Sequence, residues 1–171
     1  MVSPGDGLSA KVLDPDDVEA LMVPLGELGL ARSWRAVGFG ALFEDAETVV
    51  QAHGGRDLMP LAPVHITATL TGSPASILLG WVRRTRIAGE LKDGTGTVPL
   101  GEASEAYEVD ILGPGGAVLR TLSATSPSVV YANADIVADF NDVPASLTVA
   151  VFQLSATAGR GFARIVTLPI S

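Results

Sequence analysis

The sequence contains no cysteine and only two histidines, which removes several kinds of reactive centre. A chain without cysteine forms no disulfide framework, no thiol redox pair and no thiolate metal site. The two histidines, His53 and His65, show neither an HExxH spacing nor a third ligand nearby in sequence. We therefore expect both to be solvated or hydrogen-bonded surface side chains, and we predict no metal site and no cofactor.

The motifs of nucleophilic catalysis and of phosphate binding are also missing. No G-x-S-x-G elbow occurs, and no serine stands beside a histidine in the sequence. The glycine-rich residues 94–97 and 113–116 lack the lysine and the strand–loop–helix context of a phosphate-binding loop. We expect turns at both places.

Four acidic residues lie close together in sequence, at Glu102, Glu105, Glu108 and Asp110. Glycosidases use paired carboxylates, so this cluster is the main candidate for acid–base chemistry. The alternation of side chains predicts that Glu108 and Asp110 face solvent, without the desolvation that makes a carboxyl group a general acid. We therefore predict no catalytic residues and a protein that is not an enzyme.

A second group of oxygen-bearing side chains comprises Asp135, Asp139, Asn141 and Asp142. Such side chains are the usual ligands of calcium, but their spacing matches no EF-hand loop. A helical turn whose acids are exposed or capping explains the group equally well. The sequence leaves open whether calcium binds here.

Basic residues are scarce, with 11 Lys and Arg against 19 Asp and Glu and a net charge of −8. A surface that binds nucleic acid needs an excess of positive charge, so nucleic acid is not an expected partner. Arg83, Arg84 and Arg86 are a local exception. We predict that they pair with acids and do not form an anion site.

Long hydrophobic runs are absent as well. No segment approaches the roughly 20 apolar residues that a membrane-spanning helix needs, so we predict no membrane insertion. Residues 1–6 show no basic segment followed by an apolar core, so we expect a soluble protein without a secretory signal peptide.

The residues that are present favour an all-β fold. Hydrophobic residues make up 47% of the chain, and 19 glycines and 11 prolines fall between short apolar runs, as turns do. Strands are expected at residues 64–70, 77–81, 107–111, 117–124, 128–131, 147–156 and 162–168, and one helical turn at 133–140. Seven short strands without a long helix predict a β-sandwich.

The order of its aromatic residues suits a fibronectin type III-like (immunoglobulin-like) sandwich. Trp81 lies in the second strand, Tyr107 opens the third, and the last hairpin turns through residues 158–161. One feature departs from this pattern, because Leu147 or Val149 occupies the place of the tyrosine that braces the corner before the sixth strand. That corner must be stabilised in another way.

Two of the expected strands carry opposite charge. Ile77, Leu79 and Trp81 alternate with lighter residues before the arginines, whereas apolar residues alternate with Glu108 and Asp110 in the later run. Such alternation predicts one buried and one solvated face. If the two runs are neighbours in a sheet, the arginines face the carboxylates across the strand pair.

The N-terminal third has a different pattern. Residues 1–30 suit a flexible lead with a short helical turn that begins near residues 14–17. Residues 31–60 predict a small β-hairpin extension, with strands at 34–43 and 48–52, and a connector to the sandwich at 61–171. A lone hairpin is marginal in water, so we expect it to pack on the next domain or on another chain.

Two loops are the best candidates for recognition, because the loops of a sandwich gather at its two ends and commonly bind partners. The first, residues 89–101, contains Lys92, Asp93 and Thr95. The second, residues 156–162, contains Arg160 and Phe162. For Phe162 the pattern favours a core aromatic, and contact with a sugar or a partner protein is the alternative.

A series of short motifs carries a resemblance to a known family. The motifs lie at residues 56–65 (RDLMPLAPVH), 81–87 (WVRRTRI), 98–102 (VPLGE), 105–107 (EAY) and 149–164 (VAVFQLSATAGRGFAR). In their order and spacing they resemble the C-terminal fibronectin type III-like region of the host-specificity or baseplate tip ("megatron") protein of rhodobacterial siphophages and gene transfer agents. The resemblance covers roughly residues 32–168.

This resemblance implies a structural and interaction module of a phage-type tail tip or baseplate. It implies a place in the virion, after synthesis in the bacterial host cytoplasm, and other tail-tip or hub proteins as partners in a homotrimeric setting. The tail-hub domains and glycosidase-like barrel of longer family members have no counterpart in this sequence, so their activity is not expected here. Whether the chain is a short gene or part of a longer protein stays open.

The alternative is a carbohydrate- or receptor-binding module that acts in host recognition and contacts a cell-surface glycan or protein. Exposed aromatic side chains would favour it, and the sequence has only two Trp and two Tyr.

Overall fold

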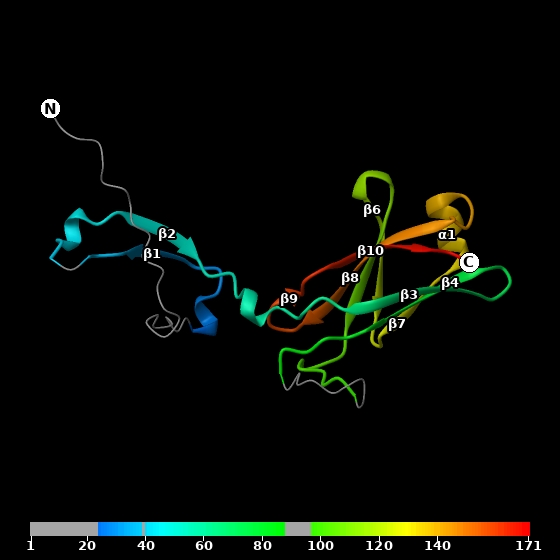
Figure 1. Ribbon diagram of the computed structural model, residues 1–171, viewed down its shortest axis with the longest axis horizontal. Helices are drawn as coiled ribbons and strands as arrows, with labels where there is room; N and C mark the ends of the chain where they lie inside the picture. The colour runs from blue at the N-terminus through cyan, green and yellow to red at the C-terminus, as the bar shows by residue number, and fades with distance from the viewer. Residues whose placement is uncertain (1–23, 39, 88–96) are drawn as a thin grey trace, which may run out of the picture. The chain divides into compact units, whose positions relative to one another are not determined.

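The computed structural model describes residues 24–38, 40–87 and 97–171, and the chain separates into two compact units, Met1–Gly54 and Gly55–Ser171 (Figure 1). The expected helical turn near residues 14–17 and the loop residues Lys92, Asp93 and Thr95 lie outside this range. No helix among the described residues is long and apolar enough to cross a membrane.

The first unit contains a two-stranded antiparallel sheet. Its strands are β1 (Ala31–Arg35) and β2 (Thr48–Ala52), with the short 3-10 helices η2 (Leu25–Glu27) before them and η3 (Phe43–Asp45) between them. The first strand ends at Arg35, earlier than the expected residue 43, and the Arg35 guanidinium binds the Thr48 hydroxyl and the Phe43 carbonyl. Every residue of both strands is exposed, so the hairpin has no core of its own.

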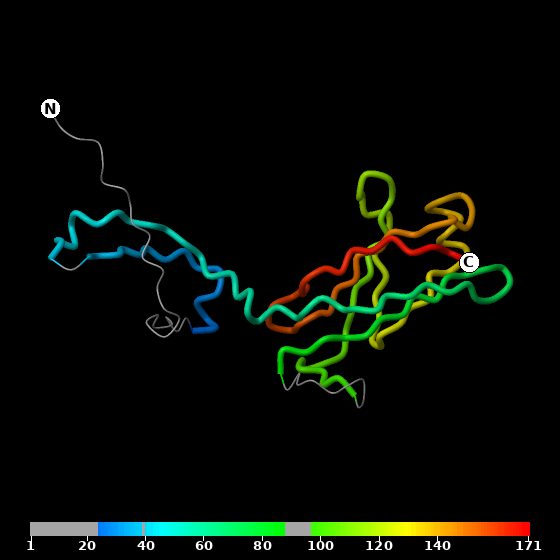
Figure 2. Tube along the Cα trace, in the orientation of Figure 1, coloured from blue at the N-terminus to red at the C-terminus, as the bar shows by residue number. Residues whose placement is uncertain are grey.

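The second unit is an all-β, fibronectin type III-like sandwich, as predicted. One sheet has the order β3-β4-β7, and the other has the order β10-β8-β5-β6, with β9 added beside β8. The strands are β3 (Val64–Thr71), β4 (Ser76–Val82), β5 (Tyr107–Leu112), β6 (Val118–Ala124), β7 (Ser128–Tyr131), β8 (Ser146–Ser155), β9 (Gly159–Arg160) and β10 (Arg164–Pro169). All pairings are antiparallel, and Figure 2 traces β8 and β10 side by side.

The core lies between the two sheets. Alternate residues of β4, β5 and β8 point into it, and the predicted alternation of the two charged runs is confirmed for their apolar residues. The fully buried apolar side chains include Ile77, Leu79, Tyr107, Val109, Ile111, Tyr131, Ile136, Val149 and Val151. Trp81 packs edge-on against Tyr107, with ring centroids 5.1 Å apart.

The two charged runs are not neighbours in one sheet. Strand β4 belongs to the first sheet and β5 to the second, so they face each other across the core. The alternation of a strand specifies which face is buried but not which strand lies beside it. Asp110 is a second correction, because it is only 4% exposed although the sequence predicted a solvated position.

The corner between β7 and β8 is braced from the preceding strand. The helix α1 (Asn133–Phe140) occupies the expected helical turn, and Tyr131, buried at the end of β7, donates its hydroxyl to the Asp139 carboxylate at 2.6 Å. The Asn133 amide binds the Ala75 carbonyl at 2.8 Å, which ties the start of α1 to the turn before β4. These contacts replace the missing corner tyrosine.

Before β3 the unit begins with the 3-10 helix η4 (Arg56–Leu58), and η5 (Pro114–Gly116) lies between β5 and β6. The boundary between units falls after Gly54, whereas the sequence placed the connector, up to residue 60, with the hairpin. The connector belongs to the sandwich because the Pro60 carbonyl accepts a hydrogen bond from the Phe162 amide at 2.9 Å.

Candidate functional site

One end of the sandwich brings together three segments that are far apart in sequence. The last hairpin meets the connector where the Phe162 amide binds the Pro60 carbonyl. It meets the segment before β5 where the Gln153 side chain donates to the Leu100 carbonyl at 3.3 Å. This end, where β9 lies, is opposite the end that carries α1 (Figure 1). The hairpin that carries Arg160 and Phe162, two of the predicted recognition residues, therefore contacts the described end of the other predicted loop at Leu100.

Gly161 permits this close approach. A Cβ atom at Gly161 would lie 2.5 Å from the Pro60 carbonyl oxygen and 2.9 Å from the Gln153 carbonyl oxygen. Contacts this short with backbone atoms are not tolerated by real Cβ atoms, and both carbonyls are fixed by hydrogen bonds to this hairpin. The hairpin can dock on the connector only because residue 161 has no side chain.

Arg160 lies on the outer face of the second sheet and is held there by acids. Its guanidinium forms a bidentate pair with Asp110 at 2.7 and 3.0 Å, binds Glu108, and stacks 4.4 Å above the Phe152 ring. Asp110 also accepts the Thr121 hydroxyl at 2.6 Å. The arginine proposed for recognition therefore neutralises the carboxylates that the sequence placed in solvent.

The charges of this cluster are strongly stabilised. Burial by itself raises the pKa of Asp110, but the hydrogen bonds from Arg160 and Thr121 and the charge of Arg160 outweigh it and lower that pKa below its ordinary value. The pKa of Arg160 is raised, chiefly by its hydrogen bonds to Asp110. A carboxyl group with a lowered pKa stays ionised and does not serve as a general acid.

Two of the three clustered arginines pair with acids, as predicted, but their partners are not the carboxylates of strand β5. Arg83 binds Glu105 at 2.9 Å, and Arg86 binds Glu102 at 2.9 Å. Glu105 also accepts the Tyr107 hydroxyl at 2.8 Å. Burial, followed by this hydrogen bond to Glu105, raises the pKa of Tyr107.

Arg84, the third arginine, is exposed and forms no ion pair with any residue that the structure describes. The prediction that all three arginines are paired is wrong for Arg84. Strand β4 ends at Val82, so strand pairing positions none of the three arginines. Arg83 and Arg86 reach acids of the segment before β5, whereas Arg84 reaches none among the described residues.

Two of the acids considered for calcium, Asp135 and Asp139, bind an arginine. Arg120 pairs with Asp139 at 2.7 Å and with Asp135 at 3.0 Å. The hydrogen bond from Arg120 is the main cause that lowers the pKa of Asp139. Asn141 ends α1 in a left-handed conformation, with φ of 68°. Across the described residues no group of three or more acidic or histidine side chains is arranged to hold a metal ion.

Neither histidine belongs to a group of three or more acidic or histidine side chains that could hold a metal ion among the described residues. His65 is exposed, with a φ of 51°, at the irregularity in the pairing of β3 with β4. His53 is exposed in the first unit, and its carbonyl accepts the Gly29 amide at 3.0 Å.

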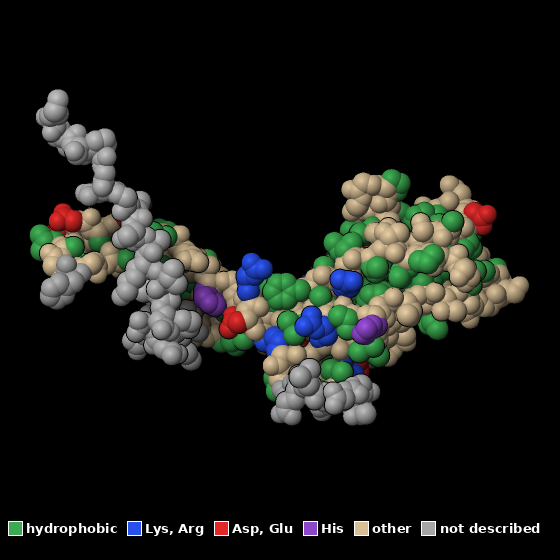
Figure 3. Space-filling view, viewed as in Figure 1, with side chains coloured by type: hydrophobic (Ala, Val, Ile, Leu, Met, Phe, Trp, Pro, Cys, Tyr) green, Lys and Arg blue, Asp and Glu red, His purple; other side chains and the backbone are tan. Residues whose placement is uncertain are grey.

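One exposed arginine stands over Phe162, and a second follows it closely in sequence. The ring is half-buried and lies outside the core, which corrects the expectation of a core aromatic. The Arg56 guanidinium stands 5.6 Å above it, and Arg164 follows at the start of β10. Both arginines are exposed, and neither pairs with an acid among the described residues. Arginine side chains gather over this end of the sandwich (Figure 3).

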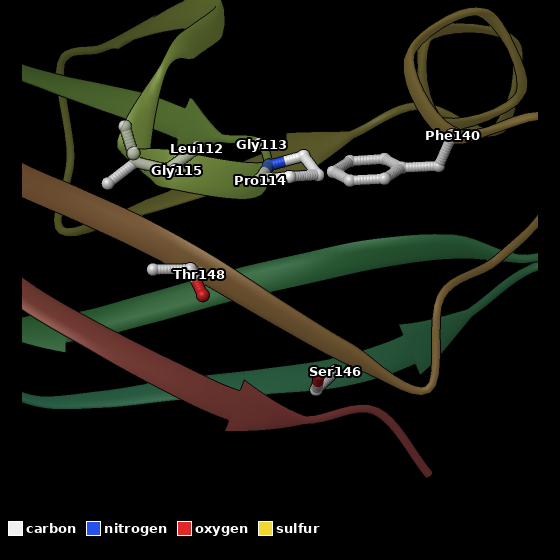
Figure 4. A pocket seen from close by; sticks show the side chains of 8 residues that line it. Leu112, Gly113, Pro114, Gly115, Phe140, Ser146 and Thr148 are labelled. Atoms are coloured by element: carbon white, nitrogen blue, oxygen red, sulfur yellow. The ribbon is translucent and has the colours of Figure 1, made fainter.

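A shallow hollow of about 380 Å³ lies elsewhere on the sandwich, beside η5 (Figure 4). Its lining consists of Leu112, residues 113–116, Phe140, Ser146 and Thr148, and the rings of Phe140 and Pro114 point toward each other. This lining has no titratable side chain, so the hollow offers neither an acid nor a base.

Comparisons with known proteins add little to this picture. No family model matches the chain, and no curated protein matches it. Among solved structures, the chain is similar to the crystal structure of the rat CD45 extracellular region, domains d3-d4. The TM-score is 0.42 with 12% identity, over 98% of this chain and 79% of that one. A similarity this weak transfers no function.

Proposed function

We propose that this chain is a non-enzymatic structural and interaction module of a phage or gene transfer agent tail tip, with roles in tail assembly and host-surface contact. The observation that carries the proposal is the ordered series of motifs that resembles the host-specificity protein. All five of its segments supply contacts that build one end of the sandwich, namely Arg83 with Glu105, Arg86 with Glu102, and Gly161 against Pro60.

The charge arrangement supports a non-enzymatic role. Glu108 and Asp110 are both held by Arg160, and Asp139 by Arg120. Acid–base catalysis needs one carboxyl group that can give up a proton near neutral pH, whereas the arginines lower the pKa of Asp110 and of Asp139 and keep those two carboxylates ionised. The carboxylates of Asp110 and Asp139 thus act as structural ions.

The location can be tested on particles from the strain that encodes the chain. Gold-labelled antibodies against the purified protein are expected to bind the distal end of the tail in electron micrographs. Particles from a strain in which the gene is deleted provide the control. Labelling of the head or of the tail shaft, or no labelling above that control, would contradict the proposal.

The surface around Phe162 favours a second candidate, a module that binds an anionic glycan or receptor. Guanidinium groups form bidentate hydrogen bonds with carboxylate, sulfate and phosphate groups, and an adjacent aromatic ring provides a stacking face. Arg56 stands over such a ring and Arg164 follows it two positions later in sequence, both without acidic partners among the described residues.

This candidate predicts that the purified chain binds anionic polysaccharide from the host envelope. Arg56→Ala and Arg164→Ala should each weaken the binding. Arg32→Ala is the matched control, because Arg32 pairs with Glu27 in the other unit and its loss removes the same charge. Equal losses in all three variants would indicate non-specific attraction and would reject the site.

A further inference from the structure

The first unit exposes an unusual amount of apolar surface. Half of the large hydrophobic side chains that are exposed in the described residues belong to it, although it supplies less than a quarter of those residues. They are Leu25, Leu30, Trp34, Val37, Leu42, Phe43, Val49 and Val50. Exposed apolar side chains that gather in this way mark contact surfaces.

The hairpin cannot stabilise itself by burial within its described residues. None of the residues of β1 and β2 is buried, and Val50 is 65% exposed. An isolated two-stranded hairpin is at best marginally stable in water, since it lacks a hydrophobic face covered by a third element. A further strand or surface must complete it.

The two edges of the hairpin differ in how they are protected. Strand β1 carries Arg32 and Arg35, and charged side chains are a common defence of an exposed edge. Strand β2 has the sequence TVVQA, with no charge and no proline, and its register with β1 is regular over all five pairs. In the described chain β2 pairs with β1 alone, so its other edge presents unpaired backbone groups.

We propose that β2 pairs with β2 of a second copy of this chain, antiparallel, about a two-fold axis through Val50. The sequence of β2 is complementary to itself in this register. Val50 meets Val50 of the second copy, Val49 meets Gln51, and Thr48 meets Ala52. No two like charges meet, and the arginine-bearing β1 strands form the outer edges of a four-stranded sheet.

A symmetric pairing is favoured over a head-to-tail one. If β2 of one copy paired with β1 of the next, each copy would still offer a free edge, and the contact would propagate without closing. The two-fold pairing uses the unprotected edge of both copies and leaves none. It follows from the hairpin alone and does not depend on where the protein acts.

A single engineered cysteine tests the pairing directly, because the natural chain has no cysteine. In full-length Val50→Cys the two cysteines would be directly opposite, with Cα atoms about 4.5 to 5.5 Å apart, which is within the range of a disulfide. Mild oxidation should give a covalent dimer that reductant reverses.

Ser33→Cys is the matched control, because Ser33 lies opposite Val50 on β1. In the four-stranded sheet the two copies of residue 33 are separated by three strand spacings, about 14 Å, which is too far for a disulfide. If Val50→Cys yields no more dimer than Ser33→Cys, the proposal is wrong.

The mass in solution gives a second test without cysteine. Light scattering of the natural chain should show a monomer that becomes a dimer as the concentration rises. Val50→Lys should stay monomeric, because it opposes two like charges at the axis. Val130→Lys is the control, since Val130 is 51% exposed on β7, an edge strand of the sandwich, and should leave the dimer intact.

A natural chain that is monomeric at every concentration would overturn the pairing, as would a trimer. A dimer that survives Val50→Lys would also overturn it, because the interface would then lie elsewhere. Circular dichroism of each variant establishes that the sandwich is folded before the masses are compared.

Discussion

Arg160 shows how one side chain can change the solvent exposure of its neighbours. Two acids on β5 would both face water if alternation alone decided their surroundings. Arg160, 50 residues away from Asp110 in sequence, covers that carboxylate and leaves it 4% exposed. The ion pair offsets the free-energy cost of burying the acid, because a buried carboxylate without a partner is strongly destabilising.

Removing Arg160 should therefore destabilise the fold. Arg160→Ala leaves Asp110 buried without its cation, and we expect the free energy of unfolding to fall by about 2 kcal/mol, below the usual range for buried pairs because the guanidinium is partly exposed. Urea denaturation of both proteins measures the difference.

Arg84→Ala is the control for this experiment. Arg84 is exposed and unpaired among the described residues, so its loss should change stability by less than about 0.5 kcal/mol. For the same reason Arg84→Glu should leave the melting temperature unchanged. If Arg84→Ala costs as much as Arg160→Ala, the assignment of the structural ion pairs is incorrect.

The lowered pKa values of Asp110 and Asp139 predict sensitivity to acid. A carboxyl group whose pKa is lower in the folded state binds fewer protons there than in the unfolded chain. Its stabilisation is complete above the unfolded pKa of about 3.9 and is lost as the pH falls through the folded pKa.

Denaturation curves from about pH 7 down to about pH 2 should therefore show falling stability in the acid range. Asp139→Asn should be less stable at neutral pH and should show a shallower loss below about pH 4, because one linked proton is removed. Parallel curves for the variant and the natural chain would contradict this assignment.

The last hairpin depends on Gly161 more than on its turn residues. Gly161→Ala places a methyl group against two fixed backbone carbonyls, so we expect a loss of about 2 to 3 kcal/mol in the free energy of unfolding. Gly159→Ala is the matched control. It has open space around it and a φ of 70°, so it should cost only about 1 kcal/mol of backbone strain. Thermal unfolding of both variants distinguishes the clash from the strain, and an equal loss would reject the clash.

The two β-rich units differ in how they are stabilised. The sandwich contains its own core of buried side chains from both sheets, whereas the described hairpin contains none. Residues 55–171 expressed alone should therefore fold cooperatively, with a melting temperature close to that of the full chain. They should also be monomeric, because β2 is missing. An unfolded fragment in calorimetry would show that the sandwich needs the N-terminal unit.

Local periodicity predicted much of the fold. The alternation of Ile77, Leu79 and Trp81 located a strand and its buried face, and the helical turn at 133–140 coincides with α1. These features depend on residues two to four positions apart, whose relation is fixed by strand or helix geometry. The candidate site was predicted less well. The sequence pattern located the hairpin of Arg160 and Phe162, but it singled out neither Arg56 nor Arg164 as a recognition residue.

Strand order and charge pairing were beyond the reach of the local pattern. Arg83 meets Glu105, 22 positions away, and Arg160 meets Glu108, 52 positions away. Such partners depend on which sheet each strand joins and on where the chain leaves that sheet. The alternation of apolar and polar residues along a strand does not distinguish one possible neighbouring strand from another. The chain's own sequence therefore defines most strands of the sandwich and their buried faces. Folding in three dimensions assigns each arginine its acid and leaves the edge of β2 unpaired, because those outcomes depend on the packing of distant segments.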